Sequence, residues 1–242
     1  MKYSCLFVCL ILSFFMGAQE FEGSWKLVEE NGEPVQNREI VRIYVDNYFS
    51  EAAKKSENNE FLYTLGGEFS DATYSEKIDF NSKNPELIGE TYKPDVEFSS
   101  SENTLTLKYA EKEQVWEKIS SERNALTGNW VITGRKRDGK INKMTPGDRR
   151  TVKILAGDRF QWIAFNSATR EFFGTGGGDY TAENGKYVEH IDLFSRDNNR
   201  VGAQLEFNFE VKDGKWHHSG KSSKGDPIYE IWSAYAEAYQ QN

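Results

Sequence analysis

Two stretches of this chain decide its fold: Phe21–Pro34, FEGSWKLVEENGEP, and Leu126–Lys140, LTGNWVITGRKRDGK. Each contains a Gly-x-Trp triplet, Gly23–Trp25 in the first and Gly128–Trp130 in the second, and each triplet is followed by a turn signal. Similarity at such a long separation indicates an internal duplication, which has to be recognised before local structure is assigned. The sequence therefore predicts two halves of similar architecture.

Three further pairs of segments follow in the same order. FLYTLGGEFS from Phe61 corresponds to FFGTGGGDYT from Phe172, TYSEKIDF from Thr73 to KYVEHIDLF from Lys186, and QVWEKI from Gln114 to YEIWSAY from Tyr229. Because insertions between the copies are small, we expect one domain in each half. The expected limits are 20–119 for the first domain, 120–125 for a linker, 126–235 for the second domain and 236–242 for a C-terminal tail.

The local pattern within each half is that of β-structure. Val201–Val211, VGAQLEFNFEV, alternates apolar residues with small or polar ones, which is typical of a half-buried strand. Asn-Gly and Asp-Gly pairs, such as Asn31-Gly32 and Asp213-Gly214, are typical of tight hairpin turns between such runs. In the second half we expect strands near 129–136, 150–156, 159–165, 171–181, 186–194, 201–211, 215–221 and 228–233. Short strands at this spacing favour an all-β antiparallel barrel or sandwich.

The Gly-x-Trp openings decide between these two architectures. Both halves resemble the lipocalin-like, or calycin-type, β-barrel proteins, in which a Gly-x-Trp on the first strand packs its ring across the closed end of the barrel. The duplicated pattern is similar to uncharacterised secreted bacterial lipocalin-like proteins. The resemblance implies two tandem antiparallel up-and-down β-barrels.

The N-terminal residues 1–19 have the features of an export signal. Lys2 precedes an apolar run from Leu6 to Phe15, which is too short to span a bilayer, and small residues follow it. Both cysteines, Cys5 and Cys9, lie in this segment, so the mature chain would have no thiol for a disulfide or a thiolate metal site. We expect the protein to be exported, either periplasmic or secreted, without a later membrane span.

The charge of the chain is acidic and unevenly divided. The whole sequence carries a formal net charge of −8. Residues 20–125 have 12 basic and 23 acidic side chains, whereas residues 126–242 have 17 and 15. An acidic protein is a poor partner for nucleic acid or an anionic membrane, and the acidic first half is a candidate surface for a protein partner.

The glycine-rich stretch Gly174–Gly178 resembles a phosphate loop only superficially. A phosphate loop leads into a helix whose N-terminal amides face the anion, whereas this stretch leads into a hairpin around Asn184-Gly185. We therefore expect the glycines to bend a strand or to allow the close approach of another backbone.

Strand alternation places an acid on an apolar face in both halves. Regular alternation puts Tyr187, Glu189, Ile191 and Leu193 on one face and Val188, His190, Asp192 and Phe194 on the other; the first half repeats the first set as Tyr74, Glu76, Ile78 and Phe80. A carboxylate on an inward face needs a partner, water or a raised pKa. Glu189 is therefore either a polar anchor for a ligand or one half of a structural salt bridge, for which Arg149 and Arg150 are candidate partners.

Aromatic and polar residues concentrate in the second half and define the candidate site. His217 and His218 are adjacent on a strand and so face opposite sides, which makes a shared metal ion unfavourable; His218 shares the face of Trp216. We expect the second barrel to bind a small, partly apolar ligand without a metal or cofactor. The expected ligand-binding residues are Trp162, Tyr187, Glu189, His218, Glu230 and Trp232.

Two other functions remain open at this point. An enzyme of the same fold could use Glu189 and His218 as general acid and base, although the sequence holds no nucleophile motif. Alternatively, side chains could fill both barrels, and the protein would then act through its surface. The non-enzymatic binding protein is the interpretation that the sequence favours.

Overall fold

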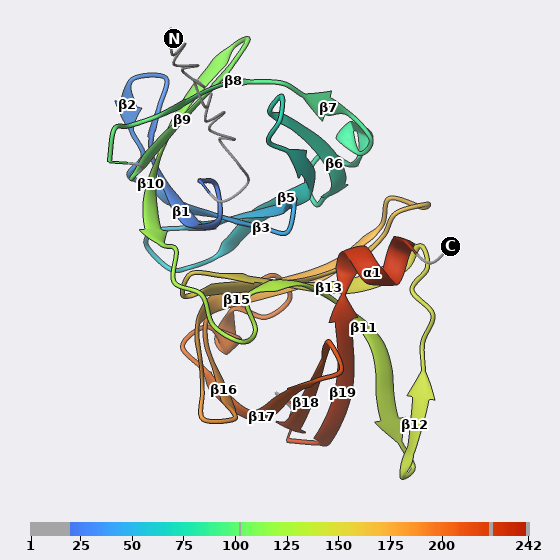
Figure 1. Cartoon of the computed structure of the whole chain (residues 1–242). Coiled ribbons are helices and arrows are strands. Elements are labelled where there is room, and N and C mark those ends of the chain that lie inside the picture. Colours follow the sequence, from blue (N-terminus) through green and yellow to red (C-terminus); the bar gives the residue numbers. More distant parts are fainter. Residues whose placement is uncertain (1–19, 102, 223–224, 241–242) are drawn as a thin grey trace, which may run out of the picture.

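The computed structural model describes residues 20–101, 103–222 and 225–240. This part of the chain forms two antiparallel β-sheets, one from each half of the sequence, and a short C-terminal helix, α1 (Tyr235–Gln240) (Figure 1). The expected signal peptide, with both cysteines, lies outside the described residues. Over the described ranges, no helix is long and apolar enough to cross a membrane.

The first sheet is an up-and-down meander in which β1, the first described strand of the chain, pairs with β10, the last strand of this half. Its described strands are β1 (Gly23–Glu30), β2 (Glu33–Pro34), β3 (Arg38–Val45), β4 (Tyr48–Lys55), β5 (Phe61–Ser70), β6 (Ser75–Asn81), β7 (Thr91–Tyr92), β8 (Asp95–Phe98), β9 (Thr104–Tyr109) and β10 (Lys112–Ser120), with a 3-10 turn, η1 (Pro85–Leu87), before β7. The strand order is β7-β6-β5-β4-β3-β1-β10-β9-β8, so the sheet stays open between β7 and β8. Pro94, which lies in this gap, has no backbone N–H to donate across it.

The second sheet repeats this order and closes. Its described strands are β11 (Gly128–Arg137), β12 (Lys140–Lys143), β13 (Arg149–Ala156), β14 (Arg159–Asn166), β15 (Phe172–Glu183), β16 (Lys186–Phe194), β17 (Gln204–Lys212), β18 (Lys215–Lys221) and β19 (Pro227–Ala234), with a 3-10 turn, η2 (Asn198–Arg200), before β17. The order is β12-β11-β13-β14-β15-β16-β17-β18-β19, and β11 pairs with β19. The first and last long strands therefore complete a barrel.

This strand order confirms the duplicated, lipocalin-like all-β fold predicted from the sequence. The first sheet ends at Ser120 and the second begins at Gly128, and we propose the domain limits 20–119 and 126–235 on this basis. Two details differ from the expected strands. The short strand β12 follows the Asp138-Gly139 turn unexpectedly, and β17 begins at Gln204 because residues 201–203 form a turn after η2.

The two Gly-x-Trp tryptophans occupy equivalent places in the two barrels. Trp25 is fully buried and Trp130 is 7% exposed. The indole Nε1 of Trp25 donates to the carbonyl oxygen of Phe21 at 2.7 Å, and that of Trp130 donates to the carbonyl oxygen of Leu126 at 2.9 Å. Each ring therefore fixes the segment that enters its own barrel.

A β-bulge in each copy changes the faces expected from regular alternation. The registers of β5 with β6 and of β15 with β16 shift at Gly66/Gly67 and Gly177/Gly178, which leaves Asp79 and Asp192 as the extra residues. Beyond the bulge, Phe80 packs between the barrels rather than beside Ile78. The predicted faces of Leu193 and Phe194 were also wrong: Phe194 contacts the ring of Trp162 inside the second barrel.

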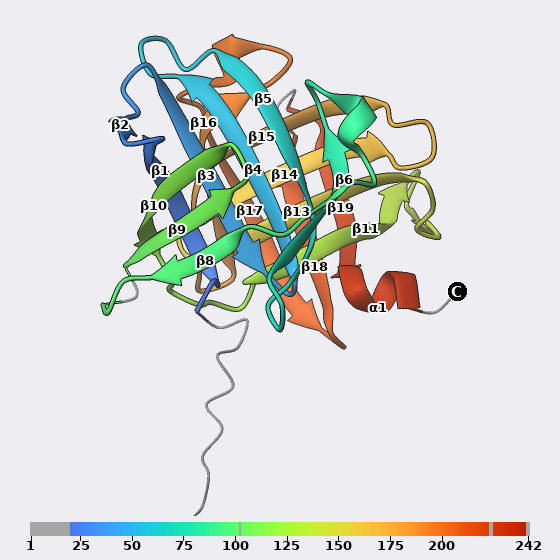
Figure 2. The same cartoon turned by 90° about the horizontal axis from the view of Figure 1, so that it is seen from above.

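Besides the hydrophobic core inside each barrel, a separate hydrophobic cluster joins the two barrels. It contains buried side chains from β3, β4 and β6 of the first sheet and from β11, β13 and β14 of the second: Ile43, Val45, Tyr48, Phe80, Val131, Val152, Ile154, Ala156, Ile163 and Phe165. Figure 2 shows β3 and β4 lying across β13 and β14. Polar contacts frame the cluster, because Gln161 Nε2 donates to Thr64 Oγ1 at 2.8 Å and Lys54 Nζ lies 3.1 Å from Asp192 Oδ2.

The bulge glycines should tolerate no side chain. We expect Gly67→Ala to lower the free energy of unfolding by at least about 2 kcal/mol, because the new Cβ would lie 1.9 Å from the backbone carbonyl oxygen of Lys77. Gly147→Ala is the matched control, since a Cβ there has no heavy atom within 4 Å. Chemical denaturation followed by tryptophan fluorescence compares the two, and equal stabilities would contradict the steric role of Gly67.

Candidate functional site

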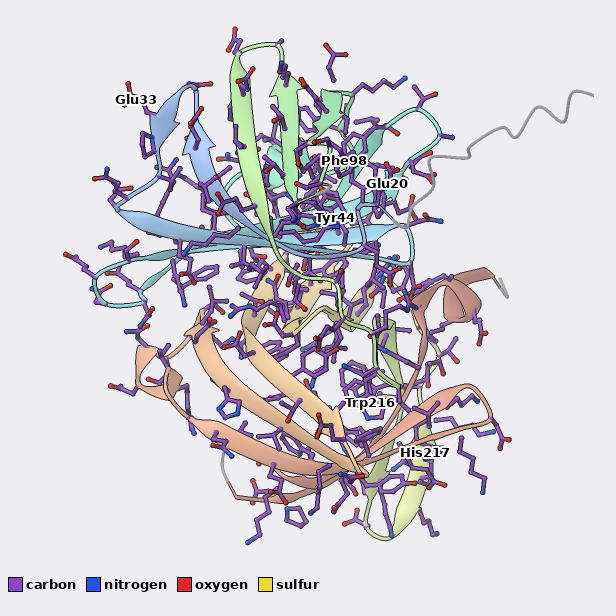
Figure 3. The ribbon with its side chains drawn as sticks, turned by 60° about the vertical axis from the view of Figure 1, so that its left-hand side comes forward. Glu20, Glu33, Tyr44, Phe98, Trp216 and His217 are labelled. Carbon is purple, nitrogen blue, oxygen red and sulfur yellow. The ribbon has the colours of Figure 1, made fainter. Side chains whose placement is uncertain are left out.

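The six residues expected to bind ligand come from four strands of the second barrel. Trp162 lies on β14, Tyr187 and Glu189 on β16, His218 on β18, and Glu230 and Trp232 on β19. All are buried except Trp162, which is half-buried. The register pairs Glu230 with His218 and Trp232 with Trp216, so that these side chains share the inner face. Figure 3 shows Trp216 inside this barrel.

Lys153 of β13 lies at the centre of this interior, although it was not among the residues predicted from the sequence. Its Nζ lies 2.7 Å from Glu189 Oε1, and both side chains are almost completely buried. The rings of Phe160, Tyr187, Trp216 and Trp232 surround the ammonium group with centroids 5.1–5.7 Å away. Each ring can contribute a cation–π attraction, which is strongest in a site shielded from water.

The expected partners of Glu189, Arg149 and Arg150, were wrong. Arg150 instead donates to the hydroxyl of Tyr235 on α1 and packs over the ring of Tyr239, outside the barrel. The alternation of β13 excludes Arg150, because Lys153 and Leu155 share the inward face and Arg150 lies on the other. Arg149 has the same parity as Lys153, but it lies at the exposed start of the strand, over the ring of Phe173. A lysine between apolar residues on the strand after Gly-x-Trp was the available signal for a buried cation.

A second cluster of polar side chains comes from β18, β19 and β11. His218 Nδ1 is 3.4 Å from Glu230 Oε2, and Arg135 Nη2 donates to Glu230 Oε1 at 2.6 Å. Burial lowers the pKa of His218, and its hydrogen bond to Glu230 offsets this only in part. Burial raises the pKa of Glu230, but the hydrogen bond from His218 and the charges of Arg135 and Lys153 outweigh it and lower the pKa to about 2. The carboxylate therefore stays ionised at neutral pH.

This arrangement does not connect the two groups proposed as acid and base. The hydrogen bonds of Glu189 and His218 go to different partners, Lys153 and Glu230, and both side chains are less than 5% exposed. His217, on the opposite face of β18, contacts the hydroxyl of Tyr229 at 2.8 Å. Within the described ranges, no three His, Cys, Asp or Glu side chains come together as a metal site.

Several ring nitrogens in the second barrel are buried without a hydrogen-bond partner among the described residues. They are Trp216 Nε1, Trp232 Nε1 and His218 Nε2. The two indole rings, Trp216 and Trp232, stack with their centroids 5.8 Å apart. A buried polar nitrogen without a partner costs free energy. The two indole donors and the imidazole acceptor therefore leave this interior with unused hydrogen-bonding capacity.

The first barrel has its own buried charge cluster, built on Arg42 of β3. Arg42 Nη1 is 2.6 Å from Glu76 Oε1, and Arg42 Nη2 is 2.5 Å from Glu51 Oε2. All three side chains are at most 4% exposed. The ring of Trp116 lies under the guanidinium, 4.7 Å from Arg42 Cζ. This cluster is the counterpart of the ion pair in the second barrel, because Arg42 pairs with Trp25 in the register as Lys153 pairs with Trp130.

Tyrosine hydroxyls also donate to the two carboxylates. Tyr74 and Tyr109 donate to Glu76 at 2.5 Å and 3.0 Å, and Tyr63 donates to Glu51 at 2.9 Å. Burial raises the pKa of Tyr74 and Tyr109, so both remain protonated donors at neutral pH. The sequence pattern placed Tyr74 and Glu76 on one face, but it did not reveal the hydroxyl partners from other strands, Tyr109 of β9 and Tyr63 of β5.

A cavity of about 490 Å³ reaches this cluster from the mouth of the first barrel. Arg42, Glu51 and Glu76 form its deep charged part. The remaining wall comes from β5, β6, η1, β7 and the β9–β10 turn and consists of Leu65, Ile78, Asn81, Asn84, Leu87, Tyr92, Tyr109, Ala110, Glu111 and Lys112. Asn81 reaches the wall because the bulge at Asp79 reverses the faces of β6. This combination of apolar walls and a few polar groups is typical of small-molecule sites.

A second hollow of about 390 Å³ lies beside the unpaired edges of β7 and β8. Phe21, Tyr74 and Phe98 contribute rings to its wall, and Lys93 to Val96 contribute the segment that crosses the seam. Figure 3 shows Phe98 and Tyr44 within the first barrel. Tyr74 lines this hollow while its hydroxyl donates to Glu76, so the charge cluster lies between the two hollows.

The first half of the chain matches a known family model. Residues 20–124 match the family model described as a domain of unknown function (DUF4488). No curated protein matches the sequence. Among solved structures, the chain is similar to a lipocalin-like protein from Bacteroides uniformis at 15% identity, covering 46% of this chain and 100% of that chain with a TM-score of 0.34.

Removal of the central lysine should destabilise the second barrel. We expect Lys153→Met to lower the free energy of unfolding by about 3–5 kcal/mol, because Glu189 would remain buried without its cation. Lys186→Met is the control, since Lys186 and Glu206 form an exposed pair and its loss should cost less than about 1 kcal/mol. Equilibrium urea denaturation measures both, and a Lys153→Met protein as stable as wild type would contradict the structural role of the pair.

Acid should weaken the second barrel through Glu230. A carboxyl whose pKa is depressed in the folded state contributes stability above its unfolded pKa of about 4.5 and loses it as the pH falls toward its folded pKa of about 2. We expect roughly 2 kcal/mol of this contribution to disappear between about pH 5 and pH 3. Urea denaturation at the two pH values should show a smaller loss for Glu230→Gln than for wild type. Identical losses would show that Glu230 is not the titrating group.

Proposed function

We propose that this chain is an exported, non-enzymatic binding protein that takes a small, partly apolar molecule into the cavity of its first barrel. The observation that carries the proposal is the cavity of about 490 Å³ that ends on buried Arg42, Glu51 and Glu76. Small-molecule pockets in proteins commonly have volumes of about 300–1,000 Å³. Leu65, Ile78 and Leu87 would bury the apolar part of the ligand, and the charged end would orient its polar part.

The open edge of the first sheet supports this location. The sheet is unpaired between β7 and β8, and Tyr92 of β7 lines the cavity. Because β7 and β8 are not hydrogen-bonded to each other, they can separate at a lower free-energy cost than two strands joined by a ladder of hydrogen bonds. Ligand entry therefore requires less disruption here than in the second barrel, where β11 and β19 complete the closure.

The second barrel is the alternative location, as proposed from the sequence. The unpartnered nitrogens favour it, because a ligand acceptor atom could accept from the indoles of Trp216 and Trp232. A ligand donor could donate to Nε2 of neutral His218, whose Nδ1 faces Glu230. In that case Trp162, Tyr187, Glu189 and Glu230 would form the rest of the site. Its rings are tightly packed around Lys153, so binding there would require them to move.

Export is the second part of the proposal. It rests on the apolar run and small residues within positions 1–19 and on the confinement of both cysteines to that segment. Determination of the N-terminal sequence of the mature protein from its native source would test it. An intact residue Met1 on the mature protein would contradict export by cleavage.

An uncharged fluorescent probe can locate the site. We expect N-phenyl-1-naphthylamine to gain fluorescence on binding to the wild-type protein, and Leu65→Trp to weaken binding at least tenfold because the larger ring fills the cavity. Leu62→Trp is the matched control on the same strand, since Leu62 is exposed and lies outside this cavity. A fluorescence titration of each variant gives the dissociation constants.

The same titration separates the two locations. Trp162→Ala and Glu189→Gln should leave probe binding unchanged if the first barrel holds the probe. Loss of binding in these two variants, with normal binding in Leu65→Trp, would move the site to the second barrel. Absence of binding to the wild-type protein would contradict the proposed function.

A further inference from the structure

The cavity of the first barrel carries an excess negative charge. Its charged lining residues are Arg42 and Lys112 against Glu51, Glu76 and Glu111, a net charge of −1. Glu111 and Lys112 lie at the exposed rim, so the excess belongs to the deep end, where one guanidinium serves two carboxylates. Because water is largely excluded there, the unbalanced carboxylate acts over a short distance with little screening.

Four of the five N–H donors of Arg42 are already engaged by neighbouring side chains. Its Nε and Nη2 donate to Glu51 at 2.9 Å and 2.5 Å, and its Nη1 donates to Glu76 at 2.6 Å and to the hydroxyl of Tyr44 at 2.8 Å. An anionic ligand would have to compete with two carboxylates for these donors. The deep end is therefore unfavourable for a carboxylate or phosphate and favourable for a cation.

The duplication supplies an internal comparison. In the register, Arg42 faces Glu51 across β3 and β4, whereas the equivalent Lys153 faces Trp162 across β13 and β14. The second barrel thus has an indole where the first has its additional carboxylate. Its other buried acid, Glu230, is balanced by Arg135. The excess negative charge is found in the copy that has the cavity.

The walls of the cavity indicate the chemical nature of the uncharged part of a cationic ligand. The rings of Tyr92 and Tyr109 meet edge to face with centroids 6.4 Å apart, and aromatic rings attract ammonium groups. Leu65, Ile78 and Leu87 add apolar surface beside them. We infer that the ligand of the first barrel is an amine whose ammonium group lies at Glu51 and Glu76 and whose compact apolar or aromatic part covers these side chains. This inference rests on the proposed function of the same cavity.

Three ligands of nearly equal size and different charge can test the inference. They are 4-phenylbutylamine, 4-phenylbutanol and 4-phenylbutyrate, titrated into the full chain at pH 7 by calorimetry and by displacement of N-phenyl-1-naphthylamine. We expect the amine to bind at least tenfold more tightly than the alcohol, and the carboxylate to bind most weakly. This ranking in the wild-type protein tests the preference for an amine without any variant.

Glu51→Gln then assigns the charge to its source. It makes the deep cluster neutral, and we expect it to bring the amine to within about twofold of the alcohol while affinity for the alcohol is kept. Glu111→Gln is the matched control at the exposed rim and should preserve most of the preference. Circular dichroism verifies that each variant is folded.

The outcomes separate the inference from the proposed function. An alcohol that binds as tightly as the amine, or a carboxylate that binds best, would overturn the amine assignment and leave the cavity as a binding site. An amine preference that survives in folded Glu51→Gln would overturn the role of this cluster. If neither the uncharged probe nor any of the three ligands binds, the proposed function itself fails.

Discussion

A buried cation on the strand that pairs with the Gly-x-Trp strand organises each barrel. Arg42 and Lys153 occupy this position, and each holds the acid that the duplicated segment turns inward, Glu76 or Glu189. Burying either carboxylate inside an apolar barrel without such a partner would carry a large desolvation cost. The tryptophans and tyrosines around the two cations depend on this pairing, because they pack against a charge that is fixed in place.

The two barrels share the same order of strands but differ in the side chains of their interiors. In the first barrel, arginine serves two carboxylates, tyrosine hydroxyls supply the remaining hydrogen bonds, and the sheet is open beside a cavity. In the second, lysine serves one carboxylate, four rings enclose the ammonium group, and the sheet is closed. Arginine can serve two acids because its planar guanidinium presents donors in several directions. The ligand-binding capacity of the duplicated protein therefore need not be the same in both halves.

The paired bulges connect the interior of each barrel to the contact between the barrels. At Asp79 and Asp192 the strand gains a residue, so the following side chains exchange faces. Phe80 thereby joins the cluster between the barrels, and Asn81 turns toward the cavity. Glycines opposite the bulges are required by close backbone approach, which explains the glycine-rich segments in both copies.

The sequence by itself determined the duplication, the β-class of both halves, their turns and the presence of an inward acid in each copy. These features depend on residue order and local alternation, which are visible along one strand. Only the tertiary structure decided that the partner of Glu189 is Lys153, that Phe80 and Leu193 leave the barrel interior, and that a cavity reaches the acid of the first half. These features depend on the register between strands and on one extra residue at each bulge. Alternation along a single strand contains no information about either.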